Sequence, residues 1–76
     1  MVLNSKVTVK PGRYRHYKGR SYEFICLAYH TETEEPMVIY QALYGTRKVW
    51  ARPYSLWIEE VEVNGTMVPR FRWIGD

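Results

Sequence analysis

The sequence is poor in cysteine, in long apolar runs and in helical periodicity, and each deficit excludes a class of protein. Its single cysteine, Cys26, excludes an intramolecular disulfide and any zinc site built from several cysteines. Because the chain has no disulfide framework, we expect a reduced, cytoplasmic protein. No segment approaches the ~20 apolar residues of a transmembrane helix, and residues 1–12 lack the apolar centre of a signal peptide. We therefore expect no membrane association.

Motifs for metals and cofactors are also missing. The glycines are isolated turn residues, so no glycine-rich loop is available to hold the phosphates of a nucleotide. Glu32, Glu34 and Glu35 lack the glycine-punctuated aspartate spacing of a calcium-binding loop. The segment from His30 to Glu32 matches half of a zinc deaminase signature, but the paired cysteines that must follow it are absent. We expect neither a cofactor nor a metal ion.

Aromatic residues and blocks of charge are what the sequence contains instead. Its 76 residues, 46% of them hydrophobic and 16% aromatic, suit a single small domain. A chain this short buries only about 60% of the surface of its unfolded state, so aromatic side chains, which bury much area each, serve its core. The net charge of +3 is arranged in blocks, with cations within 6–20, 47–52 and 70–72 and glutamates within 32–35 and 59–62. Such blocks predict either a basic and an acidic side or ordinary ion pairing between strands.

Short alternating segments bounded by turn residues predict antiparallel strands. The pairs Lys18-Gly19 and Asn64-Gly65 indicate tight turns, and the second pair is typical of a type I′ hairpin. Residues 54–57 are too few for an α-helix and predict one short 3₁₀ turn. The strands are expected at residues 13–17, 21–30, 37–44, 48–52, 58–63 and 67–74.

These elements predict an all-β fold: a small, partly open SH3-like barrel of five to six antiparallel strands. We expect residues 11–76 to form this single domain and residues 1–10 to be a loosely ordered N-terminal lead-in. The long segment 21–30 is apolar on both faces, which one bent strand of a barrel explains. Cys26 lies in the middle of this segment, where we expect a buried thiol.

The segment 38–53 predicts a hairpin, and the register of its two strands decides which side chains face each other. In the register that a three-residue loop favours, the facing pairs are Tyr44 with Lys48, Ala42 with Trp50 and Tyr40 with Arg52. The core face would then be apolar, with Ile39, Leu43, Val49 and Ala51, and the other face would carry Tyr40, Tyr44, Lys48, Trp50 and Arg52. A one-residue change in loop length would instead place Trp50 and Arg52 opposite Gln41 and its neighbours. If Tyr40 and Trp50 lie inside the core, the aromatic and cationic surface does not exist.

Four segments together resemble one known family. They are "PGRYRHYKGRSYEF", "AYHTETEEPMVIYQALYG", "VWARP" and "IEEVEVNGTMVPRFRWIG". They are similar to the small bacterial family called domain of unknown function 1653, and the resemblance covers about residues 11–75. It implies a compact SH3-like β fold and no established activity. Its motifs fall on His16, Tyr17, His30, Glu32, Thr33, Tyr40, Tyr44, Trp50 and Arg52.

Aromatic side chains beside cations predict a binding surface. Our first hypothesis is a non-enzymatic binding module for a protein or peptide segment, because small barrels hold extended peptides in aromatic grooves. The chain itself is expected to be a monomer or a weak homo-oligomer. The candidate ligand-binding residues are Tyr40, Tyr44, Trp50, Arg52, His30, Glu32, His16 and Tyr14.

Two alternatives stay open. The same face, together with the basic residues of 13–20, has the aromatic and cationic side chains with which small barrels bind RNA or single-stranded DNA. The third hypothesis is a small enzyme that acts through His30 and Glu32.

Overall fold

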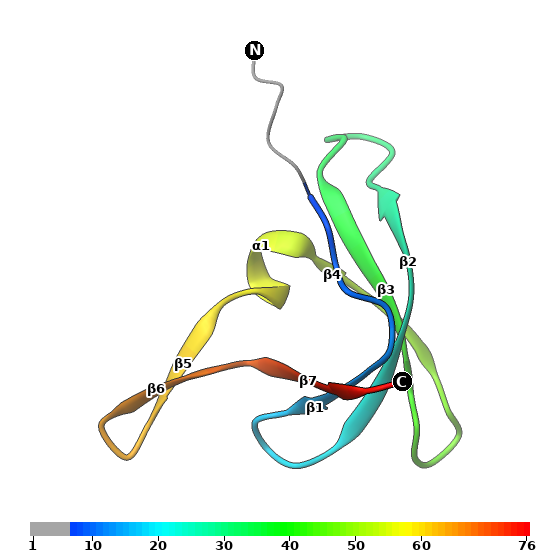
Figure 1. Ribbon diagram of the computed structural model, residues 1–76. Coiled ribbons are helices and arrows are strands. Elements are labelled where there is room, and N and C mark those ends of the chain that lie inside the picture. Colours follow the sequence, from blue (N-terminus) through cyan, green and yellow to red (C-terminus); the bar gives the residue numbers. More distant parts are fainter. Residues whose placement is uncertain (1–6) are drawn as a thin grey trace.

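Two antiparallel sheets organise the chain (Figure 1). The structure is a computed structural model that describes residues 7–76. The main sheet has five strands in the order β4-β3-β2-β1-β7, and β5 and β6 form a ribbon that projects to one side. The elements are β1 (Arg13–His16), β2 (Ser21–Tyr29), β3 (Pro36–Ala42), β4 (Val49–Pro53), α1 (Tyr54–Trp57), β5 (Glu60–Val63), β6 (Thr66–Pro69) and β7 (Phe71–Gly75). The all-β prediction is confirmed.

The seventh strand arises because the expected strand 67–74 is divided at Arg70. The backbone N–H of Arg70 donates to the carbonyl of Glu59 (3.0 Å), and its carbonyl accepts from the N–H of Tyr17 (2.9 Å). One residue therefore joins the ribbon to the main sheet, and β6 and β7 pair with different partners. At the tip of the ribbon, Asn64 and Gly65 both have positive φ, 52° and 82°, as the predicted type I′ turn requires.

The main sheet curls over one core without closing into a barrel, because β4 and β7 remain its two edges. The buried side chains are Tyr14, Val38, Tyr40, Ala42, Trp57 and Phe71. The helical turn α1 follows β4 and brings Trp57 against Phe71 of β7, with ring centroids 3.9 Å apart and planes 11° apart. The turn is α-helical rather than 3₁₀, because the N–H of Ile58 reaches the carbonyl of Tyr54, four residues earlier, at 3.1 Å.

The register of the β3–β4 hairpin differs from the prediction by two residues. Trp50 lies opposite Tyr40, not opposite Ala42, and Arg52 lies opposite Val38. The loop between the strands spans 43–48 instead of three residues. The last hydrogen bond before this loop runs from the N–H of Ala42 to the carbonyl of Lys48, at 2.9 Å.

The predicted inner and outer faces of this hairpin are exchanged. A shift of two residues keeps the same residues together on each face, but Tyr40 is only 5% exposed whereas Val49 is 56% exposed. The prediction that Tyr40 lies on an outer surface is therefore wrong. The strand residues expected inside, Ile39, Val49 and Ala51, lie on the outer face, and Leu43 lies in the loop.

A β-bulge at Ile25 explains why β2 is apolar on both faces. Phe24 pairs with Tyr40 and Cys26 pairs with Ile39, so Ile25 is the extra residue between them. Before the bulge, Tyr22 and Phe24 face the core. After the bulge the faces are exchanged, so Leu27, which pairs with buried Val38, faces the core. Cys26 consequently faces outward and is exposed, so the prediction of a buried thiol is wrong.

Residues 7–10 of the predicted lead-in contact the domain; residues 1–6 lie outside the described part of the chain. Val9 packs against the core, and the hydroxyl of Tyr14 donates to the carbonyl of Lys10 at 2.6 Å. The ammonium of Lys10 lies 3.6 Å from the ring centroid of Trp73. Across residues 7–76, no helix has the length and apolar character needed to cross a membrane.

We predict that Trp57→Ala lowers the free energy of unfolding by about 3–5 kcal/mol, the usual cost of removing a buried tryptophan. Urea unfolding followed by far-ultraviolet circular dichroism measures this loss. Trp50→Ala is the matched control, because Trp50 is 47% exposed at the sheet edge and its loss should cost about 1 kcal/mol or less. Equal losses for the two variants would contradict a core centred on Trp57.

Candidate functional site

A cluster of aromatic rings lines the open side of the core, between the edge strands β4 and β7. The ring of Tyr22 on β2 lies at its centre, 5.4 Å from Tyr40 and 5.7 Å from Phe71. Tyr44 adjoins it at 5.5 Å, and the imidazole of His16 lies 5.0 Å from Phe71. Most of these rings meet edge to face, the geometry that their quadrupoles favour. The cluster is therefore a rigid platform built from four strands and one loop.

Cations lie over the rings of this platform. The guanidinium of Arg52 on β4 lies 5.4 Å from the ring centroid of Phe71 on β7, so it spans the gap between the two edge strands. Its Nε donates to the hydroxyl of Tyr40 at 3.2 Å. Arg20 lies 4.4 Å from the ring centroid of Tyr44. These contacts hold positive charge at fixed points over an apolar surface.

The hydroxyl groups of Tyr22 and Tyr44 are hydrogen-bonded to each other at 2.6 Å. Burial, and after it the hydrogen bond with Tyr44, raises the pKa of Tyr22 to about 12. Tyr22 therefore stays neutral across the physiological range, and its short hydrogen bond to Tyr44 fixes the first part of the β3–β4 loop against β2.

His16 is the one histidine among the described residues whose pKa the cations of this face lower. Its Nδ1 accepts from the backbone N–H of Lys18 at 3.1 Å, which places the proton of the neutral ring on Nε2. Burial lowers the pKa of His16, and the positive charges of Arg52, Arg70 and Lys18 lower it further. The imidazole is thus a neutral donor beside several permanent cations, and an anion bound among them would restore its pKa.

A shallow cavity of about 260 Å³ continues the platform toward the β3–β4 loop. Trp50 forms one wall, and Lys48 lies 5.9 Å from its ring centroid. The cavity is lined by Ala42, Tyr44, Gly45, Thr46, Lys48 and Trp50. A ligand that enters it meets an exposed indole and an ammonium group next to the tyrosine pair.

The structure brings five of the predicted site residues together: Tyr40, Tyr44, Trp50, Arg52 and His16. Tyr40 is buried and orients Arg52 instead of facing a ligand. Tyr14 is buried on the other side of the core, where its ring meets Trp57 at 5.2 Å. Burial raises the pKa of Tyr14. Tyr14 is therefore a core residue.

His30 and Glu32 lie apart from this platform, in the β2–β3 loop at the opposite end of the sheet (Figure 1). The Nδ1 of His30 accepts from the backbone N–H of Glu32 at 3.1 Å and lies 3.7 Å from its carboxylate. Both side chains are exposed. These hydrogen bonds describe an ordered loop, and within residues 7–76 no three His, Cys, Asp or Glu side chains gather as a metal site would require.

Sequence reasoning missed Arg20, Tyr22 and Phe71 as members of the platform. Tyr22 lies in a segment that is apolar on both faces, so nothing in the sequence distinguishes its ring from core packing. Arg20 and Phe71 are more than 45 residues apart in the chain, and only the pairing of β1 with both β2 and β7 brings them to the same cluster of rings. The one available signal was the alternation of cations and aromatic rings in residues 13–22.

Comparison with known proteins agrees with the resemblance seen in the sequence. Residues 12–73 match the family described as protein of unknown function (DUF1653). The chain is similar to the crystal structure of a DUF1653 protein from Bordetella bronchiseptica, with 38% identity, a TM-score of 0.81, and 88% of each chain covered. No curated protein matches the chain.

We predict that Arg52→Gln raises the pKa of His16. After burial, the positive charge of Arg52 is the largest cause of the lowered pKa, and the variant removes it. NMR titration of the imidazole signals measures this shift. Arg52→Lys, which keeps the charge, should leave the pKa low, and His30 at the far end of the sheet provides a reference signal in the same spectra. An unchanged His16 titration in Arg52→Gln would refute the proximity of the two groups.

The lowered pKa of His16 also predicts a dependence of stability on pH. The folded pKa lies below that of the unfolded chain, about 6.5, so the unfolded state binds more protons in between. The contribution of neutral His16 to the free energy of unfolding is complete above about pH 6.5 and is lost as the pH falls through the folded pKa. His16→Gln should therefore lose less stability than the parent chain between about pH 7 and pH 5 in urea unfolding. An identical loss in both proteins would contradict this assignment.

Proposed function

We propose that this chain, which belongs to the DUF1653 family of proteins of unknown function, is a non-enzymatic module that binds an acidic peptide segment of a partner protein. The segment would occupy the open side of the core. One observation carries the proposal: Arg20, Lys48 and Arg52 lie over aromatic rings on one face and have no carboxylate partners in residues 7–76.

The uncompensated charge favours an anionic ligand. The ion pairs of the described residues join Arg70 to Glu59 at 2.9 Å and His30 to Glu32 at 3.7 Å, and neither includes a cation that lies over the platform. The acidic β2–β3 loop lies at the other end of the sheet. Carboxylates of a partner would therefore meet a surface of one sign, at guanidinium groups whose orientation is already fixed.

The edge strand β4 favours an extended peptide. Only β3 pairs with β4 in residues 7–76, so the outer edge of Val49–Pro53 offers backbone donors and acceptors. A peptide that adds to this edge as another strand places alternate side chains beside Trp50 and Arg52, which share one face. Backbone hydrogen bonds would supply affinity, and the two side chains would select acidic residues.

The rings themselves favour a peptide over a single-stranded nucleic acid. Stacking of bases requires aromatic faces that are open to the ligand. Tyr40 and Phe71 are buried, and a cation already lies over Tyr44 and near Trp50. A carboxylate reaches a guanidinium without displacing it from its ring. A peptide is therefore the favoured ligand, and binding of single-stranded nucleic acid is the alternative outcome of the experiment below.

The SH3-like form, a bacterial source and a cytoplasmic location belong to the same proposal. The curled antiparallel sheet with one helical turn before β5 supports the first. The likeness to a protein of Bordetella bronchiseptica supports the second. The thiol of Cys26 is exposed, as suits a reducing compartment.

The test is an NMR shift titration with three probes at two salt concentrations. The probes are a capped peptide of alternating glutamate and valine, the same peptide with lysine for glutamate, and a short oligothymidylate. We expect the acidic peptide to shift the amides of β4 and the indole N–H of Trp50. Arg52→Gln should weaken its binding about five- to tenfold, as expected for one charge-assisted contact. Arg13→Gln, which removes a charge at the other end of β1, should leave the affinity within about twofold.

Two results would overturn the proposal. One is binding of the oligothymidylate alone, with a logarithmic salt slope of about −0.7 per phosphate contact, which would assign the face to single-stranded nucleic acid. The other is a set of shifts confined to the loop of His30 and Glu32.

A further inference from the structure

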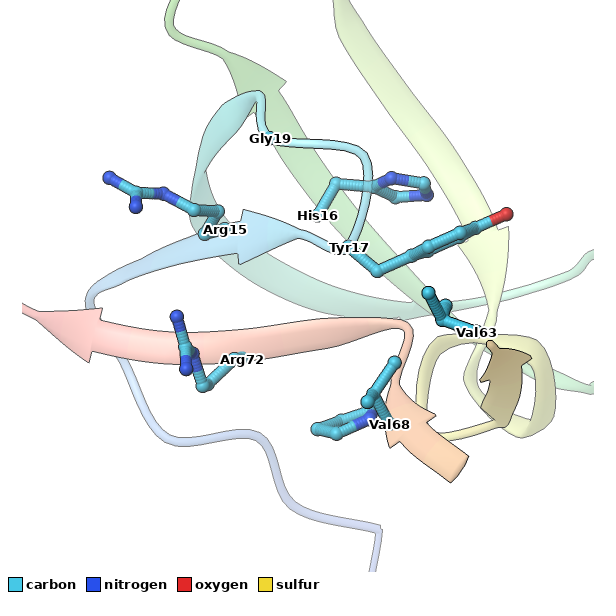
Figure 2. Close-up of a pocket in the computed structure, with 8 residues that line it drawn as sticks. Arg15, His16, Tyr17, Gly19, Val63, Val68 and Arg72 are labelled. Carbon is cyan, nitrogen blue, oxygen red and sulfur yellow. The ribbon is translucent and has the colours of Figure 1, made fainter. Parts of the chain in front are cut away.

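A second pocket, which shares His16 with the platform, lies between the β1–β7 pair and the β5–β6 ribbon. Its volume is about 310 Å³, the lower limit for sites that hold small ligands. Figure 2 shows Arg15 and Arg72 at one end and Tyr17, Val63 and Val68 at the other. The pocket is therefore cationic at one end and apolar at the other.

The two arginines are direct neighbours across β1 and β7. Arg15 on β1 and Arg72 on β7 are Cα partners in the antiparallel register, so their side chains leave the sheet on the same face. Neither forms an ion pair within residues 7–76, and residues 1–6 contain no acidic side chain. Like charges placed directly opposite each other destabilise a sheet. An anion held between them would convert this repulsion into attraction.

The backbone around the pocket leaves the guanidinium groups as its main donors. The N–H of Gly19 donates to the carbonyl of His16 (2.7 Å), and the N–H of Tyr17 donates to the carbonyl of Arg70 (2.9 Å). The N–H of Lys18 is also taken, by the Nδ1 of His16. Two guanidinium forks satisfy the two oxygens of a carboxylate. The further oxygens of a phosphate would find only the Nε2–H of His16 and the hydroxyl of Tyr17 as donors, beside valine and proline side chains that offer none.

The apolar end suits a short branched body. Val63 and Val68 come from the two strands of the ribbon, and Pro69 and the ring of Tyr17 complete this end. A side chain or acyl tail of a few carbons would bury its surface here while its carboxylate reaches the arginines.

We propose that this pocket binds a carboxylate that carries a short branched apolar tail. Two sources share this chemistry: the C-terminus of a peptide that ends in a residue such as leucine, and a free branched organic acid. The site uses none of the cations of the proposed function, because Arg15 and Arg72 project on the opposite side of the sheet from the buried neighbours Tyr14 and Phe71, whereas Arg52 lies against that core. The two sites share only His16.

The experiment is an NMR titration of the full chain, with the methyl signals of Val63 and Val68 as reporters. The probes are N-acetyl-valyl-leucine, its C-terminal amide, 4-methylpentanoate and inorganic phosphate. We expect at least one carboxylate to bind and the amide to bind at least about tenfold more weakly, because it lacks the charge. Tighter binding of the acetylated dipeptide assigns the site to a protein C-terminus, and tighter binding of 4-methylpentanoate assigns it to a free acid.

Variants separate the two ends of the pocket. Arg15→Gln and Arg72→Gln should each weaken binding about five- to tenfold, whereas Arg47→Gln, which removes the same charge from the β3–β4 loop, should not. Because the arginine pair is repulsive without its ligand, Arg72→Gln should not lower the thermal midpoint of the free protein, although a merely structural arginine would. Val68→Thr should weaken the carboxylate and leave phosphate unaffected.

Three results would overturn the site. They are equal binding of the acid and its amide, phosphate binding as tight as that of either carboxylate, and unchanged affinity in both arginine variants. Arg52→Gln tests the acidic peptide, whereas Arg15→Gln and Arg72→Gln test the branched carboxylate. The two proposals can therefore be contradicted separately.

Discussion

The stack of Trp57 on Phe71 is the contact on which the rest of the structure depends. The main sheet has two free edges, β4 and β7, and no backbone hydrogen bonds join them in the described residues. The short turn α1 carries Trp57 from the end of β4 to the face of β7, where its ring lies 3.9 Å from that of Phe71. Side-chain packing thus holds the two edges of the sheet together, whereas in a closed barrel backbone hydrogen bonds do so. The sheet stays curled because an indole and a phenyl ring exclude water between its ends.

An opening sealed by side chains explains the character of the candidate site. Arg52 lies across it, over Phe71 and hydrogen-bonded to Tyr40, so one guanidinium covers the core and presents charge to solvent. The neighbouring cations Arg20 and Lys48 rest on rings rather than on carboxylates, which leaves this surface positive. Burial, and after it the charges of Arg52, Arg70 and Lys18, lowers the pKa of His16. Packing and recognition therefore use the same residues, and a ligand would meet groups whose orientation has already been fixed.

Much of the fold could be read from local patterns, whereas the site could be read only in part. The turns at Lys18-Gly19 and Asn64-Gly65, the strand segments and the all-β class follow from alternation and turn residues within a few positions. The hairpin loop proved longer than expected, and its register moved by two residues. Because two is the period of a strand, the faces kept their members, and Trp50 still lies on the same face as Arg52. The alternation could not say which face lies inside.

The sequence by itself determined the strands, their turns, the family and the grouping of Trp50 with Arg52 on one face. Tertiary structure alone decided that this face is the core side, since Ile39, Val49 and Ala51 on the other face are equally apolar. The physical reason is that burial depends on partners far along the chain: Trp57 and Phe71 cover Tyr40, whereas Val49 stays 56% exposed. The opposed pair Arg15 and Arg72 likewise exists only once β1 and β7 are neighbours.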